Sequence, residues 1–235
     1  MLDILLKAGE KYQMKRAGII TYFTVRSEVD WIGYPMPAIY TDPKLRAFRE
    51  WLPANGWEGR SELAGSFVSD NIEDYYLTPW DMGYHNRINW DRDFIGKDAL
   101  VAMKDKEHRV KKMLIWDPED VTRVYRSQFE KDEIPFKHMG MPRATYGFTQ
   151  YDTVYTKSGD VAGLSVCSIF TANEGRYTSA AVLKPEYAEA GQELEILWGE
   201  PNGGSRKKHV EKHRQTKIKA TVASAPYSVL AMNKR

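Results

Sequence analysis

In the second half of the chain, apolar and polar residues alternate over short stretches. Ile218, Ala220 and Val222 are separated by polar or charged residues, and residues 193–198 show the same alternation. Side chains on a β-strand point to opposite faces in turn, so a period of two indicates a strand with one buried face. The C-terminal part of the chain is therefore predicted to be mainly β.

Further stretches of similar length predict additional strands. Clusters of Gly, Asn, Ser and Pro separate them, as expected for tight turns. The predicted strands are Lys111–Trp116, Phe148–Tyr155, Val161–Phe170 and Tyr177–Leu183. Asp117–Glu133 is acidic and predicts a helical insertion. Short strands joined by turns favour an antiparallel barrel or sandwich.

The first half predicts helices and loops. Leu2–Arg16 places apolar residues near helical spacing, and Gly18 is a plausible stop. This helix begins almost at the first residue, as it would in a truncated domain. Ile19–Val25 is expected to be extended.

Two short helices are expected further along. Pro43–Leu52 has proline at its first position and stops at Pro53, and Lys97–Lys104 forms the second. Residues 54–90 are irregular and aromatic, and a loop of this length is usually functional or specifically packed. We expect an α+β protein with two domains, residues 1–105 and 106–235.

Composition and charge exclude several classes. The formal charge is +2, from 34 basic and 32 acidic residues, so the balance favours no nucleic-acid partner. No stretch approaches the ~20 apolar residues of a membrane span, and no signal peptide is recognisable. One cysteine cannot form an intrachain disulfide. We therefore expect a cytoplasmic protein that binds no membrane.

Two charged motifs were weighed as sites. His209 and His213 lack a third ligand and the order of a metalloprotease, so no metal is expected. Residues 206–219 are rich in lysine and arginine, which favours a solvated hairpin edge. The alternative is a nucleic-acid face on a barrel, whose affinity would fall steeply with salt.

Three groups of motifs, in order along the chain, resemble the family of the glycine-cleavage T-protein, the aminomethyltransferases. The first runs from Leu5-Leu6-Lys7-Ala8-Gly9-Glu10 to Ala17-Gly18. The second is Leu77-Thr78-Pro79-Trp80-Asp81-Met82-Gly83-Tyr84, followed by Asp93-Phe94-Ile95-Gly96-Lys97-Asp98-Ala99-Leu100. The third is Val161-Ala162-Gly163-Leu164-Ser165, Thr178-Ser179-Ala180-Ala181-Val182 and Gly191-Gln192-Glu193-Leu194.

The resemblance implies a fold and an activity. Residues 1–105 would be the remainder of a mixed α/β folate and substrate domain, and residues 106–235 the family's C-terminal antiparallel β-barrel. Within the family, the following stretches look most like the tetrahydrofolate-dependent vanillate and syringate O-demethylases: Pro35-Met36-Pro37-Ala38-Ile39-Tyr40, Asp74-Tyr75-Tyr76-Leu77-Thr78-Pro79-Trp80-Asp81 and Trp198-Gly199-Glu200-Pro201. The family's N-terminal folate-binding half has no counterpart here.

The resemblance also assigns candidate site residues. Tyr22-Phe23 stands where aminomethyltransferases carry Arg-Asp, which favours an aryl demethylase. Tyr22 would be the acid, or the hydrogen-bond donor, at the ether oxygen. Trp31 would stack on the substrate ring or the pterin, and Tyr34 would line the ligand channel. The sequence alone favours Tyr22 as a core or rim aromatic, and only the resemblance makes a functional role comparable. Trp31 is equally well explained as a core residue.

Three charged residues have weaker functional interpretations. Arg26 and Glu28 would share a face if their segment is a strand, either as a structural pair or as ligand contacts. Arg60 would pair with a carboxylate of folate or substrate, or else lie in solvent.

The predicted function is methyl transfer from a methoxylated aromatic acid to tetrahydrofolate, in concert with a folate-binding half in the same or another chain. Two alternatives remain open. One is a non-catalytic barrel that docks on a separate folate domain. The other is an aminomethyltransferase-like enzyme with another methyl or aminomethyl donor.

Overall fold

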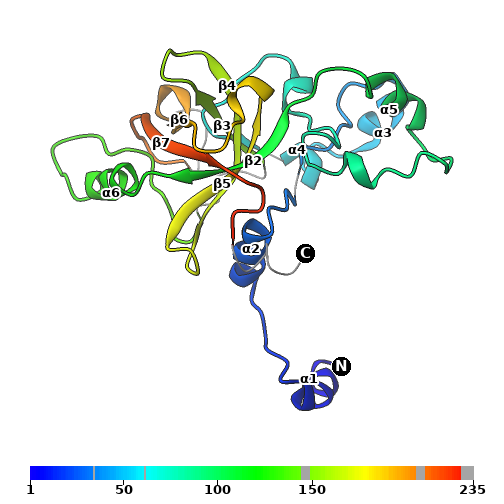
Figure 1. Cartoon of the computed structure of the whole chain (residues 1–235), viewed down its shortest axis with the longest axis horizontal. Coiled ribbons are helices and arrows are strands. Elements are labelled where there is room, and N and C mark those ends of the chain that lie inside the picture. Colours follow the sequence, from blue (N-terminus) through cyan, green and yellow to red (C-terminus); the bar gives the residue numbers. More distant parts are fainter. Residues whose placement is uncertain (34, 61, 144–148, 205–209, 229–235) are drawn as a thin grey trace.

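The computed structural model describes the chain except for residues 34, 61, 144–148, 205–209 and 229–235 (Figure 1). Short helices occupy the first half and strands the second. The helices are α1 Leu2–Gly9, α2 Ile19–Glu28, α3 Arg46–Trp51, α4 Trp57–Arg60, α5 Lys97–Met103 and α6 Pro118–Ser127. The strands are β1 Leu63–Ala64, β2 Val110–Trp116, β3 Thr149–Tyr155, β4 Val161–Thr171, β5 Arg176–Leu183, β6 Glu193–Trp198 and β7 Thr216–Ala223.

The strands form a closed antiparallel barrel. Within the described residues the sheet order is β1-β3-β4-β5-β2-β7-β6, and an additional pairing of β3 with β6 closes the ring. β1 is a two-residue parallel addition to the edge of β3. The expectation of an α+β protein with an antiparallel barrel is confirmed. Closure leaves no open edge among β2 to β7, which removes the hazard of edge-to-edge pairing.

The barrel interior is filled by the apolar positions that the alternation predicted. In β7, Ile218, Ala220 and Val222 are buried, while Lys217 and Lys219 are exposed. The same cluster contains two fully buried indoles, Trp116 and Trp198, whose rings meet edge to face 5.6 Å apart. The interior is packed with side chains and is therefore the core of the fold.

A second apolar cluster covers the outer face of β2 to β5. Its members are Ile32, Tyr75, Met113, Tyr151, Leu164, Val166, Ala180 and Val182. Ile32 and Tyr75 come from the irregular first half, so that segment packs on the barrel. With both faces covered, β5 is buried from Tyr177 to Leu183. This packing fixes the N-terminal segments on one side of the barrel.

Local capping explains the ends of several helices. The Asp117 side chain accepts a hydrogen bond from the backbone N–H of Asp120 at 2.9 Å, and Pro118 occupies the first position of α6. Asp42 and Pro43 start the short 3₁₀ turn before α3 in the same way. These are preferred residues for a helix N-terminus. The helices predicted at 43–52 and 97–104 are confirmed with slightly different bounds, and the one predicted at 117–133 is confirmed only as far as Ser127, where α6 ends.

The expectation of an extended stretch at Ile19–Val25 is wrong, because these residues belong to α2. Their β-branched side chains favour strands, but propensity is a weak preference that tertiary packing overrides. α2 packs on β4 and β5 and buries Arg26 and Ser27. The first helix is also shorter than expected, since α1 ends at Gly9 and one 3₁₀ turn follows to Tyr12.

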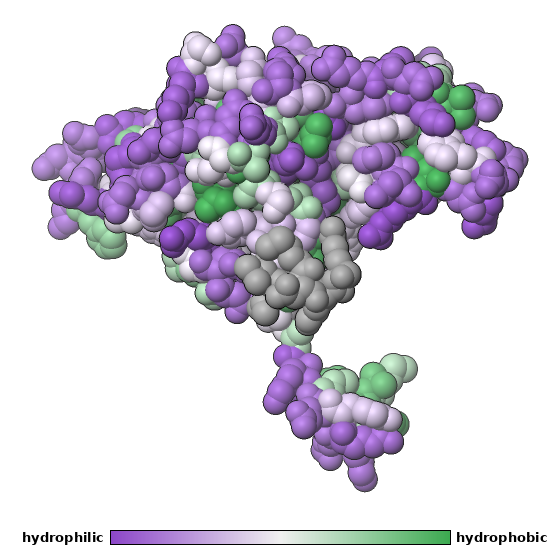
Figure 2. Space-filling view, viewed as in Figure 1, coloured by the Kyte–Doolittle hydropathy of each residue, from purple (hydrophilic) through white to green (hydrophobic). Residues whose placement is uncertain are grey.

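Helix α1 stands away from the rest of the molecule (Figure 1). Gly9 is its only buried residue, and Leu2, Ile4 and Leu5 are exposed. Figure 2 shows apolar side chains gathered on this helix. No helix among the described residues is long and apolar enough to cross a membrane.

Candidate functional site

Tyr22 and Trp31 lie together at the C-terminal side of α2. The Tyr22 ring meets the Trp31 ring edge to face, with centroids 6.0 Å apart, and meets Phe23 at 5.8 Å. Tyr22 is 38% exposed and Trp31 41% exposed, so neither side chain is sealed inside the fold. The helix brings together two aromatic residues nine positions apart.

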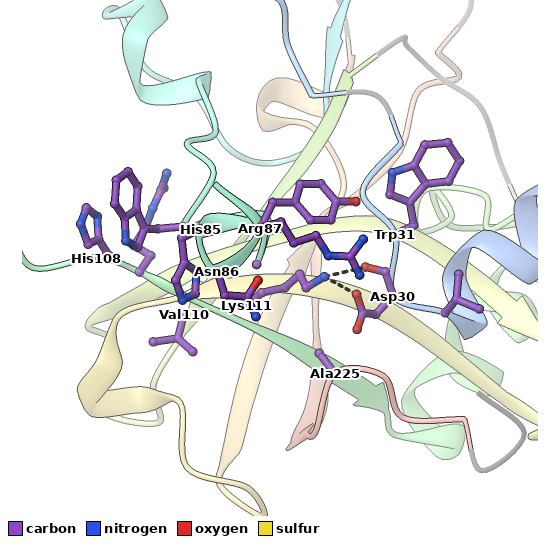
Figure 3. A pocket seen from close by; sticks show the side chains of 14 residues that line it. Asp30, Trp31, His85, Asn86, Arg87, His108, Val110, Lys111 and Ala225 are labelled. Carbon is purple, nitrogen blue, oxygen red and sulfur yellow. Dashed lines mark hydrogen bonds and ion pairs between the residues drawn. The ribbon is translucent and has the colours of Figure 1, made fainter. Parts of the chain in front are cut away.

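Trp31 also lines a cleft of about 700 Å³. Four segments form it: the residues that follow α2, the loop from Trp80 to Arg87, the start of β2 with the two residues before it, and Ala225 after β7. The lining residues are Val29, Asp30, Trp31, Trp80, Gly83, Tyr84, His85, Asn86, Arg87, His108, Arg109, Val110, Lys111 and Ala225 (Figure 3). This volume lies within the range of small-molecule sites.

A buried ion pair ties the end of α2 to the barrel. The Lys111 ammonium, on β2, donates to a carboxylate oxygen of Asp30 and to the Asp30 carbonyl at 3.0 Å (Figure 3). Asp30 has a left-handed backbone (φ 58°), which turns the chain so that both oxygens face Lys111. Gly83 permits the close approach, because a Cβ there would lie 2.9 Å from Lys111 Cε.

A second ion pair holds the opposite wall. Arg109 Nε and Nη2 donate to the two carboxylate oxygens of Asp81, at 3.0 and 2.9 Å. Asp81 also accepts from the backbone N–H and the hydroxyl of Thr78, at 2.8 and 3.0 Å. A bidentate arginine–carboxylate pair is strong and fixes geometry. The Thr78–Asp81 turn is thereby fixed beside the cleft.

Aromatic rings form much of the surface of the cleft. Trp80 stacks on His108, with ring centroids 4.1 Å apart and planes 7° apart. Tyr84 lies between two cations: Lys111 Nζ is 5.6 Å and Arg87 Cζ 5.9 Å from its ring centroid. Burial, and secondarily the Asp30 carboxylate, raise the pKa of the Tyr84 hydroxyl, while Arg87 lowers it. Tyr84 is therefore a neutral hydrogen-bonding group at pH 7.

Tyr22 contacts Trp31 but does not itself line the cleft, and neither do Arg26, Glu28 and Arg60. Arg26 and Glu28 do not share a face, because two positions along a helix differ by about 200°. Arg26 is buried and its guanidinium lies 5.3 Å from the Phe23 ring, whereas Glu28 accepts from Asn173 Nδ2 at 2.8 Å. Arg60 is exposed in α4 and does not line the cleft as described. Tyr34 lies outside the described residues.

The sequence pattern did not predict the two ion pairs of the cleft. It also did not identify Tyr84 or Arg87 as site residues. Asp30 and Lys111 are 81 residues apart, and Asp81 and Arg109 are 28 apart, so no local period links them. One signal was present: residues 77–84 carried part of the family resemblance and directly precede His85-Asn86-Arg87. Within the described part of the chain, no group of three His, Cys, Asp or Glu side chains is arranged to hold a metal.

Comparison with known proteins finds relatives among enzymes that transfer one-carbon groups, including the following three. A syringate O-demethylase from Sphingobium sp. is 38% identical over 227 residues, which cover 97% of this chain and 49% of that protein. A sesamin methylene transferase from Sinomonas sp. is 26% identical, over 97% of this chain and 50% of that protein. A probable aminomethyltransferase from Thermococcus kodakarensis is 28% identical, over 84% of this chain and 37% of that protein.

The chain thus spans half or less of the length of these curated relatives. No family model matches it. The similarity to the first two relatives extends over nearly the whole chain, and the closed antiparallel barrel fits the C-terminal barrel of the T-protein. Over most of its length the chain is therefore similar to proteins of the glycine-cleavage T-protein (aminomethyltransferase) family and to an O-demethylase, which is consistent with the C-terminal portion of such a protein.

Proposed function

We propose that this protein is part of a tetrahydrofolate-dependent O-demethylase, which transfers a methyl group from a methoxylated aromatic acid of the vanillate or syringate type. The observation that supports this best is the contact between Tyr22, an accessible phenol, and Trp31, which lines the aromatic cleft. An acid and a flat stacking surface are what cleavage of an aryl ether needs.

The residues of the cleft fit tetrahydrofolate as well as a benzoate. Trp31, Trp80 and Tyr84 offer aromatic surface for a flat ring, and Arg87 offers a positive charge for a carboxylate. When bound, tetrahydrofolate supplies the N5 nitrogen that accepts the methyl group. We propose that Trp31 holds the substrate ring or the pterin in the part of the cleft next to Tyr22, whose ring contacts Trp31.

Tyr22 is proposed to protonate the leaving oxygen. The bond between the methyl carbon and the aryl oxygen breaks, its electron pair stays on the oxygen, and the Tyr22 hydroxyl donates a proton so that a phenol leaves. Tyr22 would regain its proton from solvent, which takes up the one proton that exchange of an N–H for an N–CH3 bond releases overall. Tyrosine and a phenol have similar proton affinities, with pKa values near 10. The free energy of proton transfer from Tyr22 to the leaving oxygen is therefore close to zero. A positioned acid contributes typically ~10²–10⁴-fold.

Because the chain spans half or less of the length of its relatives, we propose that catalysis requires a folate-binding half, in the same or another chain. The assay mixes the protein with tetrahydrofolate and vanillate or syringate. It is run alone and with the N-terminal half of the Sphingobium relative, after gel filtration has shown that the two associate. Chromatography then measures the demethylated phenol and methyltetrahydrofolate.

We expect product only from the complex, and a loss of roughly 10²–10⁴-fold in kcat for Tyr22→Phe. Tyr12→Phe, an equally simple change at an exposed tyrosine of the 3₁₀ turn, is the control and should keep full activity. Absence of methyl loss from a complex that has formed would refute the demethylase proposal. Full activity of Tyr22→Phe would remove Tyr22 as the acid.

A second candidate is transfer of a methylene or aminomethyl group. The similarity to the sesamin methylene transferase and to the probable aminomethyltransferase favours it. The same complex assayed with methylenedioxy and aminomethyl donors separates the two functions, because each leaves a different folate product.

A further inference from the structure

We infer that the cleft between α2 and β2 is a carboxylate-binding site, in which Arg87 holds the acid group of a ligand with a flat aromatic body. The inference deepens the proposed function and rests on it for the choice of ligands. It concerns binding only, so it is testable without methyl transfer.

The charges in the cleft single out Arg87. Lys111 is neutralised by Asp30, and Arg109 by Asp81. Among the described residues, the guanidinium of Arg87 has no acidic partner within 4.0 Å and contacts only the Tyr84 ring, 5.9 Å from its centroid. A guanidinium offers a planar fork of donors that matches a carboxylate. Arg87 is thus the cation of the cleft that remains free to bind an anion.

The backbone positions Arg87 before any ligand arrives. Tyr84 N donates to Pro79 O at 2.7 Å, and Arg87 N donates to Tyr84 O at 2.9 Å. These bonds hold the residues that follow the Thr78–Asp81 turn, which the Asp81–Arg109 ion pair fixes. Figure 3 shows the Arg87 side chain extending across the cleft toward Asp30 and Trp31. These bonds fix the backbone from which the exposed Arg87 side chain extends, which lowers the entropy cost of binding for the backbone alone.

The surroundings of Arg87 favour an aromatic ligand. Trp31, which is 41% exposed, presents ring surface in the same cleft, and Trp80 and Tyr84 are also among its lining residues. The volume of about 700 Å³ exceeds that of a single benzoate. Two ligands of the proposed reaction carry a carboxylate on an aromatic body. One is the methoxybenzoate itself, and the other is the aminobenzoyl-glutamate portion of folate.

The experiment measures binding to the protein by quenching of tryptophan fluorescence, with calorimetry as a second readout. Vanillate is compared with vanillyl alcohol, and 4-aminobenzoyl-glutamate with 4-aminobenzamide. In each pair only the first carries a carboxylate. We expect one of the acids to bind at least roughly tenfold more tightly than its neutral analogue, as a charge-assisted hydrogen bond would produce. The pair that shows the difference identifies the source of the carboxylate.

Arg87→Gln should remove that tenfold advantage and leave the affinity of the neutral analogue unchanged. Arg46→Gln, at an exposed arginine of α3 outside the cleft, is the matched control and should change neither. Circular dichroism verifies that both variants fold.

Equal binding of acid and neutral analogue in both pairs would overturn the inference, as would undiminished acid binding by Arg87→Gln or no saturable binding of either acid. A protein that binds an acid through Arg87 but, in the complex, releases no methyl group would keep this inference and lose the proposed function.

Discussion

At the scale of single residues, the most buried charges lie away from the cleft, where Lys137, Glu200 and His213 meet at the end of β6. Lys137 is 0% exposed and donates to Glu200 Oε1 at 2.7 Å, as does Gly65 N at 3.1 Å. The Glu200 backbone N–H donates to His213 Nε2 at 2.9 Å, so the proton of that neutral ring is on Nδ1 and points to Glu211 O. The 3.4 Å approach of His213 Nε2 to Glu200 Oε2 is then no ion pair.

Removing one member of the buried Lys137–Glu200 ion pair should destabilise the protein far more than removing both charges. We expect Lys137→Met to lower the free energy of unfolding by about 3–5 kcal/mol, because Glu200 stays charged and buried. The double variant Lys137→Met with Glu200→Gln should recover most of the loss. Urea unfolding at pH 7 measures both, and equal losses in the single and double variants would contradict the prediction.

The same pair predicts a pH dependence. Burial alone raises the pKa of Glu200, but the charge and hydrogen bond of Lys137 outweigh it and lower the pKa below its ordinary 4.5. The stabilisation is therefore present above pH 4.5 and lost as pH falls through the folded pKa. Glu200→Gln should flatten the fall in stability over this acidic range. The pKa of Asp152 is raised, mainly by burial and also by the Glu200 charge, so Asp152 acts with the opposite sign. Glu200→Gln removes that charge and thereby also reduces the opposing effect of Asp152.

At the scale of elements, the barrel depends on a close approach of β4 to β5 at Gly163. Its backbone has φ 156°, and a Cβ there would lie 2.2 Å from the carbonyl oxygen of Val182. Backbone cannot move aside as a flexible side chain can. Glycine at this position is required by the contact between the two strands.

Gly163→Ala should therefore destabilise the protein by about 2–3 kcal/mol, as overpacking of a tight contact does. Gly159→Ala, in the preceding turn, is the control: its φ is 96° but nothing lies within 4 Å of the added Cβ. That change should cost about 1 kcal/mol, from backbone conformation alone. Thermal unfolding compares the two, and similar losses would contradict the proposed contact.

At the scale of the whole molecule, the barrel and α1 should differ in stability. An eight-residue helix with one buried residue has little tertiary support, and isolated helices of this length are marginal. We expect the amides of α1 to exchange with solvent nearly as in an unfolded peptide, while those of β2 and β5 require global unfolding. Hydrogen exchange followed by mass spectrometry measures this. Association with the folate-binding half should protect α1 and α2 if they lie at the interface, and unchanged exchange would exclude them from it.

The sequence by itself determined most strands and most helices, because each depends on a local pattern. That pattern left a barrel and a sandwich open, and the family resemblance favoured the barrel. Alternation in 216–222 is a property of neighbouring residues, and so are the caps at Asp42 and Asp117. Motif resemblance added the family and the pair Tyr22 and Trp31, which the structure brings into contact.

Only the tertiary structure decided that residues 19–25 are helical and which residues line the cleft. The β-branched residues of 19–25 favour a strand, but packing on β4 and β5 makes them helical. Asp30 meets Lys111, and Asp81 meets Arg109, because closure of the barrel and burial of its outer face bring distant segments together. The physical reason is the distance along the sequence over which each interaction acts. Hydrophobic periodicity and helix capping involve residues a few positions apart, whereas an ion pair between residues 81 positions apart forms only once the chain has folded.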